Sequence, residues 1–467
     1  MVKSIYIHGL RGFGEARTIE FAMPNGQAGS GITFIVGGNN SGKTTILEAL
    51  RSFNCYTHNK PSFSERKRNK KCEQGKVHLK MISDDNTCYS IDTADRGGSP
   101  TTLTLNGEPF GGEWNPPTVF ALQSRRFVEY EFHHNNMNRF DYIRNQQWNH
   151  YNRSAILSEF SSRLFRMYEH KEDFDPILRS VIGYDLEWTI EQNDNGTYYL
   201  KLILGGCEHS SEGLGDGIWS IFTICDALYD SNPGDTIAID EPELSLHPAY
   251  QKKTMDLLNR YSADRQIIIN THSPYFIDLC SIINGAYLYR TVKNHNGDID
   301  TFGLSEESRE NLRGFLTDIN QPHTLGTEAK EIFFLEDKII LVEGQEDVIM
   351  YKLASESVEI PLCGTFFGWG AGGAPKIPKV LRLLQDLGYA KVAVIFDGDK
   401  ISDKEELSQT YPQYNFFNIS TDDVRDKKAI VNRPAKSGIM TIKGKLKDEH
   451  QDEIRSLFVS INESLSN

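Results

Sequence analysis

Residues 32–44 read Ile-Thr-Phe-Ile-Val-Gly-Gly-Asn-Asn-Ser-Gly-Lys-Thr. The apolar start predicts a short buried strand, and residues 43–53 have the spacing of a helix. The part between them fits the pattern G-x-x-x-x-G-K-[ST], in which backbone N–H groups turn inward around phosphate groups. Lys43 then supplies a charge to the β- and γ-phosphates, and Thr44 supplies a hydroxyl to Mg²⁺. The pattern predicts a nucleotide site formed by Gly37, Asn39, Asn40, Ser41, Gly42, Lys43, Thr44 and Thr45.

Two further apolar runs supply polar groups that a nucleotide site needs. Residues 236–239 predict a strand that ends in Asp240 and Glu241, and residues 266–270 predict another that is followed by Thr-His-Ser-Pro. One carboxylate at such a strand end holds the water shell of magnesium, and a base orients the attacking water. Helices are expected between these strands, so this part of the chain is predicted to be an α/β domain.

A second pair of apolar strands lies in the last third of the chain. Residues 338–342 lead into Glu343 and Gly344, and residues 391–396 lead into Asp-Gly-Asp at 397–399. The C-terminal ends of parallel strands lie at one edge of the sheet, where ligands of open α/β sheets bind. Three carboxylates there would repel one another without a divalent metal, and oxygen ligands suit Mg²⁺ or Mn²⁺ better than zinc. We therefore expect a second, smaller α/β unit with a metal site.

Composition limits the class of protein. The 467 residues include 50 Lys and Arg against 64 Asp and Glu, a net charge of −14. Bulk charge does not favour nucleic acid, so a polyanion would need a local basic patch or bound metal. Seven scattered cysteines without a C-x-x-C pair predict reduced thiols. No apolar run approaches the roughly 20 residues of a membrane span, and the start lacks a signal-peptide pattern. We expect a cytoplasmic protein without a membrane partner.

The first set of motifs resembles the ABC-type ATPases of the SMC/RecF kind. The resemblance implies that Asp240 binds Mg²⁺, that Glu241 polarises the attacking water, and that His272 reaches the γ-phosphate. It also implies that Gln123, which follows a short apolar run, is the Q-loop glutamine of the family. The implied cofactor is ATP with Mg²⁺, and the implied reaction is ATP hydrolysis.

The signature sequence of that family, LSGGQ, is absent here in its strict form. The best candidate is Ser-Ser-Glu-Gly-Leu-Gly-Asp-Gly at 210–217, directly before a predicted helix. In the family this segment completes the nucleotide pocket of a second subunit. The resemblance therefore implies that Gly215 and Gly217 contact ATP across a dimer, while Asp216 departs from the family pattern.

The second set of motifs resembles the TOPRIM domain of type IA and II topoisomerases, DnaG-type primases and OLD (overcoming lysogenisation defect) nucleases. The resemblance implies that Glu343, Asp397 and Asp399 are catalytic metal ligands, with Asp347 in support one helical turn on. OLD nucleases also carry a lysine near this domain's end that supports the transition state, and Lys443 is our candidate. The glycine of the family's D-x-D-x-x-G pattern is replaced by serine at position 402.

The combination resembles the OLD family over nearly the whole chain. The aromatic and Asn-rich segment 127–185 is predicted to be a helical insertion that forms the dimer contact, for which Trp148 is a test position. We expect an ATPase domain at 1–126 and 186–292, the insertion at 127–185, a linker at 293–330 and a TOPRIM domain at 331–467.

The resemblance implies a metal-dependent DNA endonuclease that is regulated by ATP and takes part in defence against phage. It implies a homodimer or larger homo-oligomer, and a co-encoded defence protein or retron components as further partners. One alternative is an ATP-driven sensor or scaffold whose TOPRIM fold does not cut. Another is a topoisomerase-like strand breaker, which would need a tyrosine nucleophile on a DNA-binding module that we do not find in the sequence.

Overall fold

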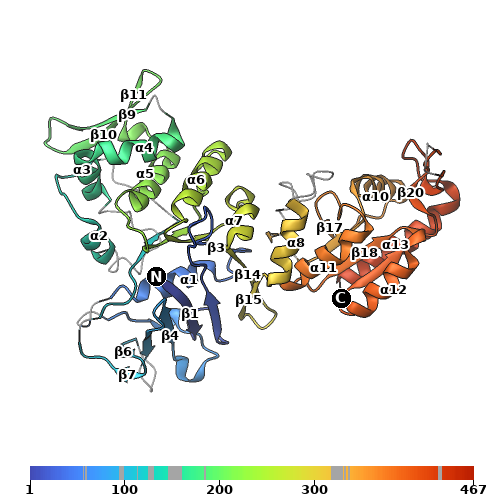
Figure 1. Ribbon diagram of the computed structural model, residues 1–467, viewed down its shortest axis with the longest axis horizontal. Coiled ribbons are helices and arrows are strands. Elements are labelled where there is room, and N and C mark those ends of the chain that lie inside the picture. Colours follow the sequence, from blue (N-terminus) through green and yellow to red (C-terminus); the bar gives the residue numbers. More distant parts are fainter. Residues whose placement is uncertain are drawn as a thin grey trace. The chain divides into compact units, whose positions relative to one another are not determined.

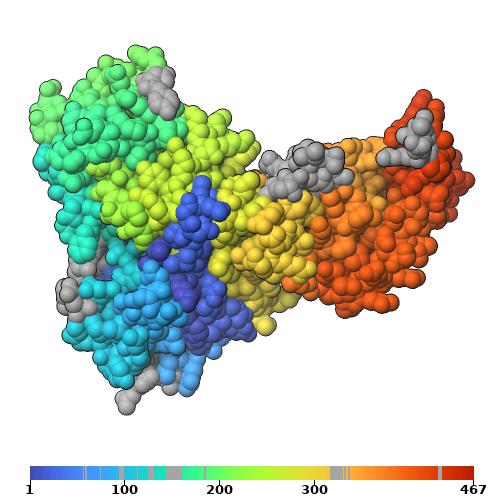
Figure 2. Space-filling model, viewed as in Figure 1, coloured from blue at the N-terminus to red at the C-terminus, as the bar shows by residue number. Residues whose placement is uncertain are grey.

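The protein has a mixed α/β fold that divides into two compact units, Met1–Thr301 and Phe302–Asn467 (Figure 1). The structure is a computed structural model and describes residues 1–55, 57, 60–93, 99–112, 114–124, 131–145, 160–183, 186–316, 330, 333–334, 337–429 and 434–466. In Figure 2 the described residues of unit 1 run from blue to yellow, and those of unit 2 from yellow to red. The predicted α/β class with a smaller second α/β unit is confirmed, and the assignment of that unit to the TOPRIM fold stays a prediction.

The central sheet of unit 1 carries the nucleotide motifs. Its strands lie in the order β15-β14-β3-β13-β12-β8, and the pairs from β14 to β8 are parallel. All residues of β3, β8, β12 and β13 are buried, as in parallel sheets that are covered on both faces. The strands are β3 (Ile32–Gly37), β8 (Val119–Leu122), β12 (Thr236–Asp240), β13 (Gln266–Asn270), β14 (Tyr287–Lys293) and β15 (Ile299–Gly303).

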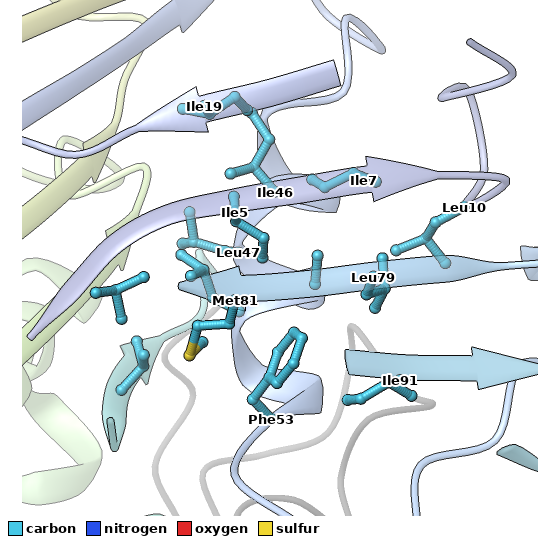
Figure 3. Packing of buried hydrophobic residues seen from close by; sticks show 14 of the residues in the cluster. Ile5, Ile7, Leu10, Ile19, Ile46, Leu47, Phe53, Leu79, Met81 and Ile91 are labelled. Carbon is cyan, nitrogen blue, oxygen red and sulfur yellow. The ribbon is translucent and has the colours of Figure 1, made fainter. Parts of the chain in front are cut away.

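A second, antiparallel sheet of unit 1 packs on the other side of helix α1 (Lys43–Ser52). Its order is β2-β1-β4-β5-β6-β7. Ile46 and Leu50 of α1 belong to one buried cluster together with Ile7 and Leu79 of this sheet and Ile268 of the central sheet (Figure 3). The helix that begins at Lys43 is thus fixed between two sheets. The strands are β1 (Val2–His8), β2 (Arg17–Glu20), β4 (His78–Ser83), β5 (Cys88–Thr93), β6 (Thr101–Leu105) and β7 (Glu108–Pro109).

Helices and a small three-stranded sheet, in the order β11-β10-β9, form the remaining part of unit 1 (Figure 1, green). The strands β9 and β10 pair around a turn at Asn195-Gly196. Helix α4 packs against both α5 and α6. These elements are α2 (Arg139–Asn145), α3 (Ser161–Glu169), α4 (Lys171–Ile182), β9 (Glu187–Gln192), β10 (Tyr198–Leu204), β11 (Cys207–Ser210), α5 (Asp216–Tyr229), α6 (Pro248–Tyr261) and α7 (Leu279–Asn284).

In the described part of the insertion 127–185, most aromatic residues are buried. We predicted a dimer contact there because we expected exposed aromatic side chains, and this expectation is wrong. Phe160 and Phe174 pack against the rings of Trp219 and Phe222 on helix α5 and are at most 1% exposed. Among the described large hydrophobic residues of the insertion, Phe140 and Tyr168 are exposed. The aromatic side chains serve the core because α3 and α4 need an apolar face against α5. Trp148 lies outside the described residues.

A buried ion network joins the insertion to helix α5. Arg163 of α3 is fully buried, and its Nη2 lies 2.8 Å from Asp226 and 2.7 Å from Asp230. Arg139 of α2 lies 3.1 Å from Asp230 and also stacks over the ring of Phe120 on β8. The network therefore links two helices of the insertion to α5, the helix that begins at the signature candidate.

We expect Arg163→Ala to destabilise unit 1 by about 3–5 kcal/mol, because it leaves the carboxylate of Asp226 buried without its partner. The urea-unfolding midpoint of the full chain measures this loss. The surface variant Lys253→Ala should leave the midpoint unchanged, and the double variant Arg163→Met/Asp226→Leu should recover part of the loss. A midpoint that stays at the parent value in Arg163→Ala would contradict the role of the network.

Unit 2 contains a parallel sheet of order β17-β16-β18-β19 and a separate parallel pair, β20 and β21. Helices α10 and α13 contribute to one buried core with β16 and β18. The predicted strands at 338–342 and 391–396 are present. The elements are α8 (Glu306–Leu316), β16 (Ile339–Leu341), α10 (Gln345–Val358), β17 (Thr365–Phe366), α11 (Ile377–Asp386), β18 (Val392–Phe396), α12 (Ile401–Thr410), β19 (Asn415–Asn418), β20 (Asp423–Arg425), β21 (Gly438–Met440) and α13 (Gln451–Ser466).

The segment 293–330, expected to be a linker, is regular over much of its described part. It contains β15 and α8, and the two units divide inside it, between Thr301 and Phe302. The linker prediction was wrong for β15 and α8. Each of them buries only a few side chains, among them Ile299 and Leu312, so the sequence shows little apolar periodicity there.

All seven cysteines are free thiols, as predicted. Cys207 and Cys280 of unit 1 and Cys363 of unit 2 are exposed, and Cys88 is half-buried. In the described part of the chain, no helix has the length and apolar character that crossing a membrane requires.

Candidate functional site

The glycine-rich loop after β3 follows a path that side chains would obstruct. Gly37 has φ 144° and Gly42 has φ 95°, and Asn40 between them has φ 61°. A Cβ atom on Gly37 would lie 2.2 Å from the carbonyl oxygen of Thr291, and one on Gly42 would lie 2.3 Å from Cδ1 of Ile299. Both positions therefore require glycine, for their backbone angles and for the lack of space.

Lys43 begins α1, and its side chain folds back over the loop. Its Nζ donates hydrogen bonds to the carbonyl oxygens of Gly37 and Gly38, both at 2.9 Å. Burial lowers the pKa of Lys43 to about 8, although the negative charges of Glu241 and Asp240 oppose the shift. An ammonium group that is so poorly solvated gains from an anionic phosphate nearby, which is the ligand that the lysine of this motif binds.

Asp240, at the end of β12, lies beside the start of α1. The parallel register pairs Asp240 with Asn270 on β13, whose Nδ2 donates a hydrogen bond of 3.0 Å to Oδ1 of Asp240. Thr44 Oγ1 donates to the same oxygen at 3.4 Å. A hydroxyl and a carboxylate side by side are the oxygen ligands that hold Mg²⁺ in P-loop nucleotide sites. The donor set fits Mg²⁺ with ATP.

The turn after β12 carries two more carboxylates. Glu241 has φ 48°, and its Oε1 lies 3.8 Å from Nε2 of His272. Glu243 accepts hydrogen bonds from Oγ1 of Thr271 at 2.8 Å and from the backbone N–H of His272 at 2.6 Å. Glu243 thus fixes the loop that presents His272. We did not predict this role, although the rigid Pro-Glu turn directly after Glu241 was a signal for it.

Charges around His272 favour its neutral form. Burial lowers the pKa of His272, and the positive charge of Lys43 lowers it further, while Asp240 opposes both. Burial also raises the pKa of Glu243. A neutral imidazole has one N–H donor and one acceptor nitrogen, so His272 is able to donate a hydrogen bond to a phosphate oxygen.

These side chains line a cavity of about 540 Å³, a volume typical of small-molecule sites. Asp240 is not part of the wall, because it is only 4% exposed behind Thr44. Arg11 and Lys293 were not predicted, since they come from elements far apart in the sequence. The residues that line the cavity are Arg11, Gly12, Asn39, Asn40, Ser41, Gly42, Lys43, Thr44, Thr45, Glu241, His272, Lys293, Gly297 and Ile299.

Gln123 directly follows β8, which pairs in parallel with β12, so it lies at the same edge of the sheet as Asp240. With its side-chain oxygen turned toward Arg51, the amide accepts hydrogen bonds from Nη1 at 2.7 Å and from Nη2 at 3.2 Å. It does not belong to the cavity wall. In this chain its connection to the nucleotide motifs runs through Arg51 of α1.

The signature candidate forms the start of α5. Gly215 is the residue before the helix, and Gly217 lies in its first turn. A Cβ atom on Gly217 would lie 2.4 Å from the carbonyl oxygen of Ser245, so this glycine packs against the turn that follows Glu241. Neither glycine lines the cavity of its own chain. A contact with the nucleotide of a second subunit stays a prediction.

In unit 2, the parallel pairing of β16 and β18 brings the second set of acids together. Ile339 lies opposite Val392 and Leu341 opposite Val394, so the residues after both strands are neighbours. Oε1 of Glu343 accepts a hydrogen bond of 3.3 Å from the backbone N–H of Asp397.

The glycine-rich loop that follows β17 closes over this strand end. The N–H of Gly373 donates to the carbonyl oxygen of Glu343 at 2.7 Å, and a Cβ on Gly370 would lie 2.7 Å from the backbone of Gly344. The turn at Glu343 is therefore fixed by backbone contacts on a loop that tolerates no side chain at position 370.

Negative charge accumulates around Asp397. Burial raises the pKa of Asp397 to about 8, and the charges of Asp347, Glu343 and Asp423 add to the shift. Burial raises the pKa of Asp347 to about 7, with further contributions from Glu343 and Asp423, although the backbone N–H of Gly344 donates to its Oδ2 at 2.8 Å. Burial likewise raises the pKa of Glu343. Carboxylates that repel one another in this way fit a divalent cation as their counter-charge.

Asp399, the fourth predicted ligand, is engaged by lysines. Nζ of Lys436 lies 3.0 Å from its Oδ2, and Nζ of Lys400 lies 3.8 Å from its Oδ1. Within the residues that the structure describes, no three His, Cys, Asp or Glu side chains converge on a point that could hold a metal ion. The predicted acids are therefore neighbours, but their oxygens do not form a ready-made ligand cage.

Lys443, our candidate for the supporting lysine, is exposed in a turn between Thr441 and Lys445. Among the described residues, no hydrogen bond or ion pair joins it to the acids. Lys427 and Lys436 face the acids instead, at 2.6 Å from Asp423 and 3.0 Å from Asp399. The sequence did not indicate that these two lysines face the acids. Their position depends on the backbone pairing of Lys427 with Lys436, in a segment that lies well after Asp399 in the chain.

We expect unit 2 to lose stability as the pH rises when no divalent cation is present. Asp347 and Asp397 have pKa values raised from 3.8 to about 7 and about 8. Protonation of these two carboxyl groups stabilises the folded state. This contribution is fully present below about pH 4, the pKa in the unfolded chain, and is lost as the pH rises through the pKa values of the folded state. Calorimetry from about pH 5 to about pH 9 should show a melting temperature that falls by several degrees. Mn²⁺ should reverse the fall, more at the alkaline end than at the acidic end.

The variant Asp397→Asn is the control for this prediction, because an amide does not titrate. It should flatten the pH profile and reduce the effect of Mn²⁺. A profile as steep as that of the parent protein would show that the pH dependence has another origin.

Comparisons with known proteins bear mainly on the first unit. Residues 69–278 match the family described as "AAA domain, putative AbiEii toxin, Type IV TA system". This match covers less than half of the chain, and it includes Asp240, Glu241 and His272 but begins after the glycine-rich loop. It supports ATPase activity for unit 1.

Two curated proteins are similar to parts of the chain. The Septu protein PtuA of Bacillus thuringiensis is 25% identical over 280 residues, which are 54% of this chain and 68% of that protein. A DNA primase of Streptomyces coelicolor (strain ATCC BAA-471 / A3(2) / M145) is 39% identical over 79 residues, which are 17% of this chain and 12% of the primase.

Among solved structures, the SMC head domain from Thermotoga maritima aligns with a TM-score of 0.39 and 15% identity, over 65% of this chain and 99% of that chain. An Smc head domain derived from Pyrococcus furiosus, with an extended coiled coil and bound to the C-terminal domain of ScpA, aligns with a TM-score of 0.43 and 12% identity, over 67% of this chain and 98% of that one.

Proposed function

We propose that this protein is a divalent-metal-dependent DNA endonuclease of the OLD type, regulated by ATP, that acts in defence against phage. The observation that carries the proposal is the contact between Glu343 and the backbone of Asp397, with Asp347 beside them, at the ends of two parallel strands. The 79 residues that are 39% identical to part of a DNA primase support it, because primases carry the TOPRIM domain that the second motif set resembles.

Glu343, Asp397 and Asp399 are the residues that would hold Mg²⁺ or Mn²⁺, with Asp347 in support. A divalent metal there supplies a Lewis acid for the phosphodiester and a water of lowered pKa. The protein's own part is to keep the carboxylates at one sheet edge. Glu343 is fixed by the N–H of Asp397, and the turn after Glu343 is fixed by Gly370 and Gly373.

Unit 1 supplies the ATP-dependent control in this proposal. Lys43 and Thr44 would bind the phosphates and Mg²⁺ with Asp240, Glu241 would orient the attacking water, and His272 would donate to the γ-phosphate. The cavity of about 540 Å³ and the mutual distances of these groups support these roles. We extend the proposal to a homodimer in which Gly215 and Gly217 meet the partner's nucleotide, and to a co-encoded defence protein or retron components as further partners.

A second candidate is an ATP-driven sensor or scaffold whose second unit does not cut. One observation favours it: the described acids do not converge on a metal point, and lysines occupy two of them. The two candidates differ in whether the protein breaks phosphodiester bonds.

A plasmid assay separates them. The purified protein is incubated with supercoiled plasmid with Mg²⁺, with Mn²⁺ or with EDTA, each with and without ATP. The endonuclease should produce nicked or linear DNA only with a divalent metal, and ATP should change the rate. Intact plasmid in every lane, while ATP is still hydrolysed, would reject the endonuclease and favour the scaffold.

A further inference from the structure

Two lysines of unit 2 are held side by side near the acids. The backbone N–H of Lys427 donates to the carbonyl of Lys436 at 2.9 Å, and the N–H of Lys436 donates back to Lys427 at 3.0 Å. Residues that exchange both hydrogen bonds in this way are direct neighbours, with their side chains on one side of the strand pair. The pair follows β20 and precedes β21, so its position is fixed by the sheet as well as by its own bonds.

Both ammonium groups are bound to carboxylates of the carboxylate cluster, by which we mean the predicted ligands Glu343, Asp347, Asp397 and Asp399 together with their neighbours Asp423 and Glu346. Nζ of Lys436 lies 3.0 Å from Asp399 and 3.8 Å from Asp423. Nζ of Lys427 lies 2.6 Å from Asp423 and 3.1 Å from Glu346. Burial and mutual repulsion disfavour the ionised form of these acids. The two lysines act as their counter-ions.

The same two lysines also line a cavity of about 640 Å³. Its wall carries four cationic side chains, Arg425, Lys427, Lys428 and Lys436, but only two acids, Asp423 and Asp426. Arg425, Lys427 and Lys436 are paired with Glu346, Asp423 and Asp399, so the wall gains an excess of positive charge once a divalent metal neutralises the cluster. Such a concave, cationic wall suits the phosphate backbone of a nucleic acid.

We propose that Lys427 and Lys436 are counter-cations of the carboxylate cluster that a divalent metal displaces, and that the released ammonium groups bind DNA phosphates in the adjoining cavity. The inference rests on the proposed function, because it takes the acids as metal ligands and DNA as the substrate. It explains why the described acids do not converge on a metal point: lysines pull Asp399 and Asp423 toward the cavity.

Exchange of this kind makes metal binding and DNA binding interdependent. Lys436 competes with the metal for the carboxylate of Asp399. Lys427 neutralises Asp423, whose negative charge acts on Asp397. Removal of either lysine should therefore tighten metal binding. Each lysine also contributes a phosphate contact once it is released, so its removal should weaken DNA binding. A lysine that served only the fold, or only DNA, would not change the two affinities in opposite directions.

The first measurement is calorimetric titration of the full chain with Mn²⁺ in the absence of nucleotide. The variants are Lys427→Gln, Lys436→Gln and the double variant. The control is Lys445→Gln, which removes an exposed lysine of the same segment. We expect each of the two single variants to bind Mn²⁺ about tenfold more tightly than the parent, equivalent to about 1.4 kcal/mol, because a positive charge beside the carboxylates is removed. Lys436→Arg should restore the parent affinity.

The second measurement is fluorescence anisotropy with a labelled DNA duplex. Ca²⁺ replaces Mn²⁺ here, and a gel confirms that the duplex stays intact. For the parent protein, Ca²⁺ should increase DNA affinity, and the slope of log affinity against log salt should become steeper. In the double variant, this slope should fall by about two, one for each lost phosphate contact.

The outcomes separate this inference from the proposed function. If the parent and Asp397→Asn bind Mn²⁺ equally, the metal site itself is wrong, and the proposed function fails with it. If the parent binds Mn²⁺ at Asp397 but the lysine variants do not bind it more tightly, the exchange is wrong while the proposed function stands. Tighter Mn²⁺ binding with unchanged DNA affinity would also overturn the exchange.

Discussion

Replacing Lys43 with alanine is expected to reduce ATP hydrolysis by about 100- to 1,000-fold, the usual cost of removing one group that stabilises charge in a transition state. The side chain is buried over the glycine-rich loop, and its ammonium group is poorly solvated. Its substitution takes away the cation that we propose meets the β- and γ-phosphates. Release of inorganic phosphate at saturating ATP measures the effect.

The control for Lys43→Ala is Lys253→Ala, which removes a lysine from the exposed face of α6. It should hydrolyse ATP like the parent protein. Equal melting temperatures of both variants would exclude a folding defect. Hydrolysis by Lys43→Ala within a few fold of the parent rate would mean that the cavity after β3 is not the site of the reaction.

Replacing Asp397 with asparagine is expected to reduce metal-dependent plasmid cleavage at least about a hundredfold, equivalent to roughly 3 kcal/mol of transition-state stabilisation. Asparagine has nearly the same shape as aspartate but lacks the charge that a divalent metal needs. Because the native carboxylate is buried among other acids, the variant should also melt at a higher temperature than the metal-free parent above about pH 8. Lower activity together with higher stability cannot result from misfolding.

Glu405→Gln is the matched control, because Glu405 is an exposed acid on α12, shortly after Asp397 and Asp399. It should leave cleavage and the melting temperature unchanged. If Asp397→Asn still cleaves at the parent rate, the assignment of the metal site to the ends of β16 and β18 is wrong.

Local patterns predicted the parts of both candidate sites that follow directly from a strand. Gly42 and Asp240 could be assigned because an apolar run leads into each motif and the residue types are specific. The strand at 391–396 was recognised for the same reason, and it positions Asp397. In each case a short segment contains both the structural signal and the functional group, so no long-range information is needed.

The parts that could not be predicted depend on contacts between distant segments. Lys436 reaches Asp399 because its backbone pairs with Lys427, and nothing near Lys436 in the sequence indicates that pairing. Phe160 and Phe174 could not be assigned to the core from the sequence, because their partners on α5 lie more than forty residues away. Arg11 enters the nucleotide cavity for the same kind of reason. Composition and periodicity describe one segment at a time. Which distant segments come into contact is determined by tertiary packing.

The exposed thiols described above offer a direct way to follow motion between the two units. Cys207 and Cys280 lie in unit 1 and Cys363 in unit 2. After replacement of Cys280 and the half-buried Cys88 by serine, maleimide dyes would attach at one position in each unit, since the remaining thiols are buried. Energy transfer between donor and acceptor would then report, in real time, whether nucleotide in the first unit changes the separation from the second.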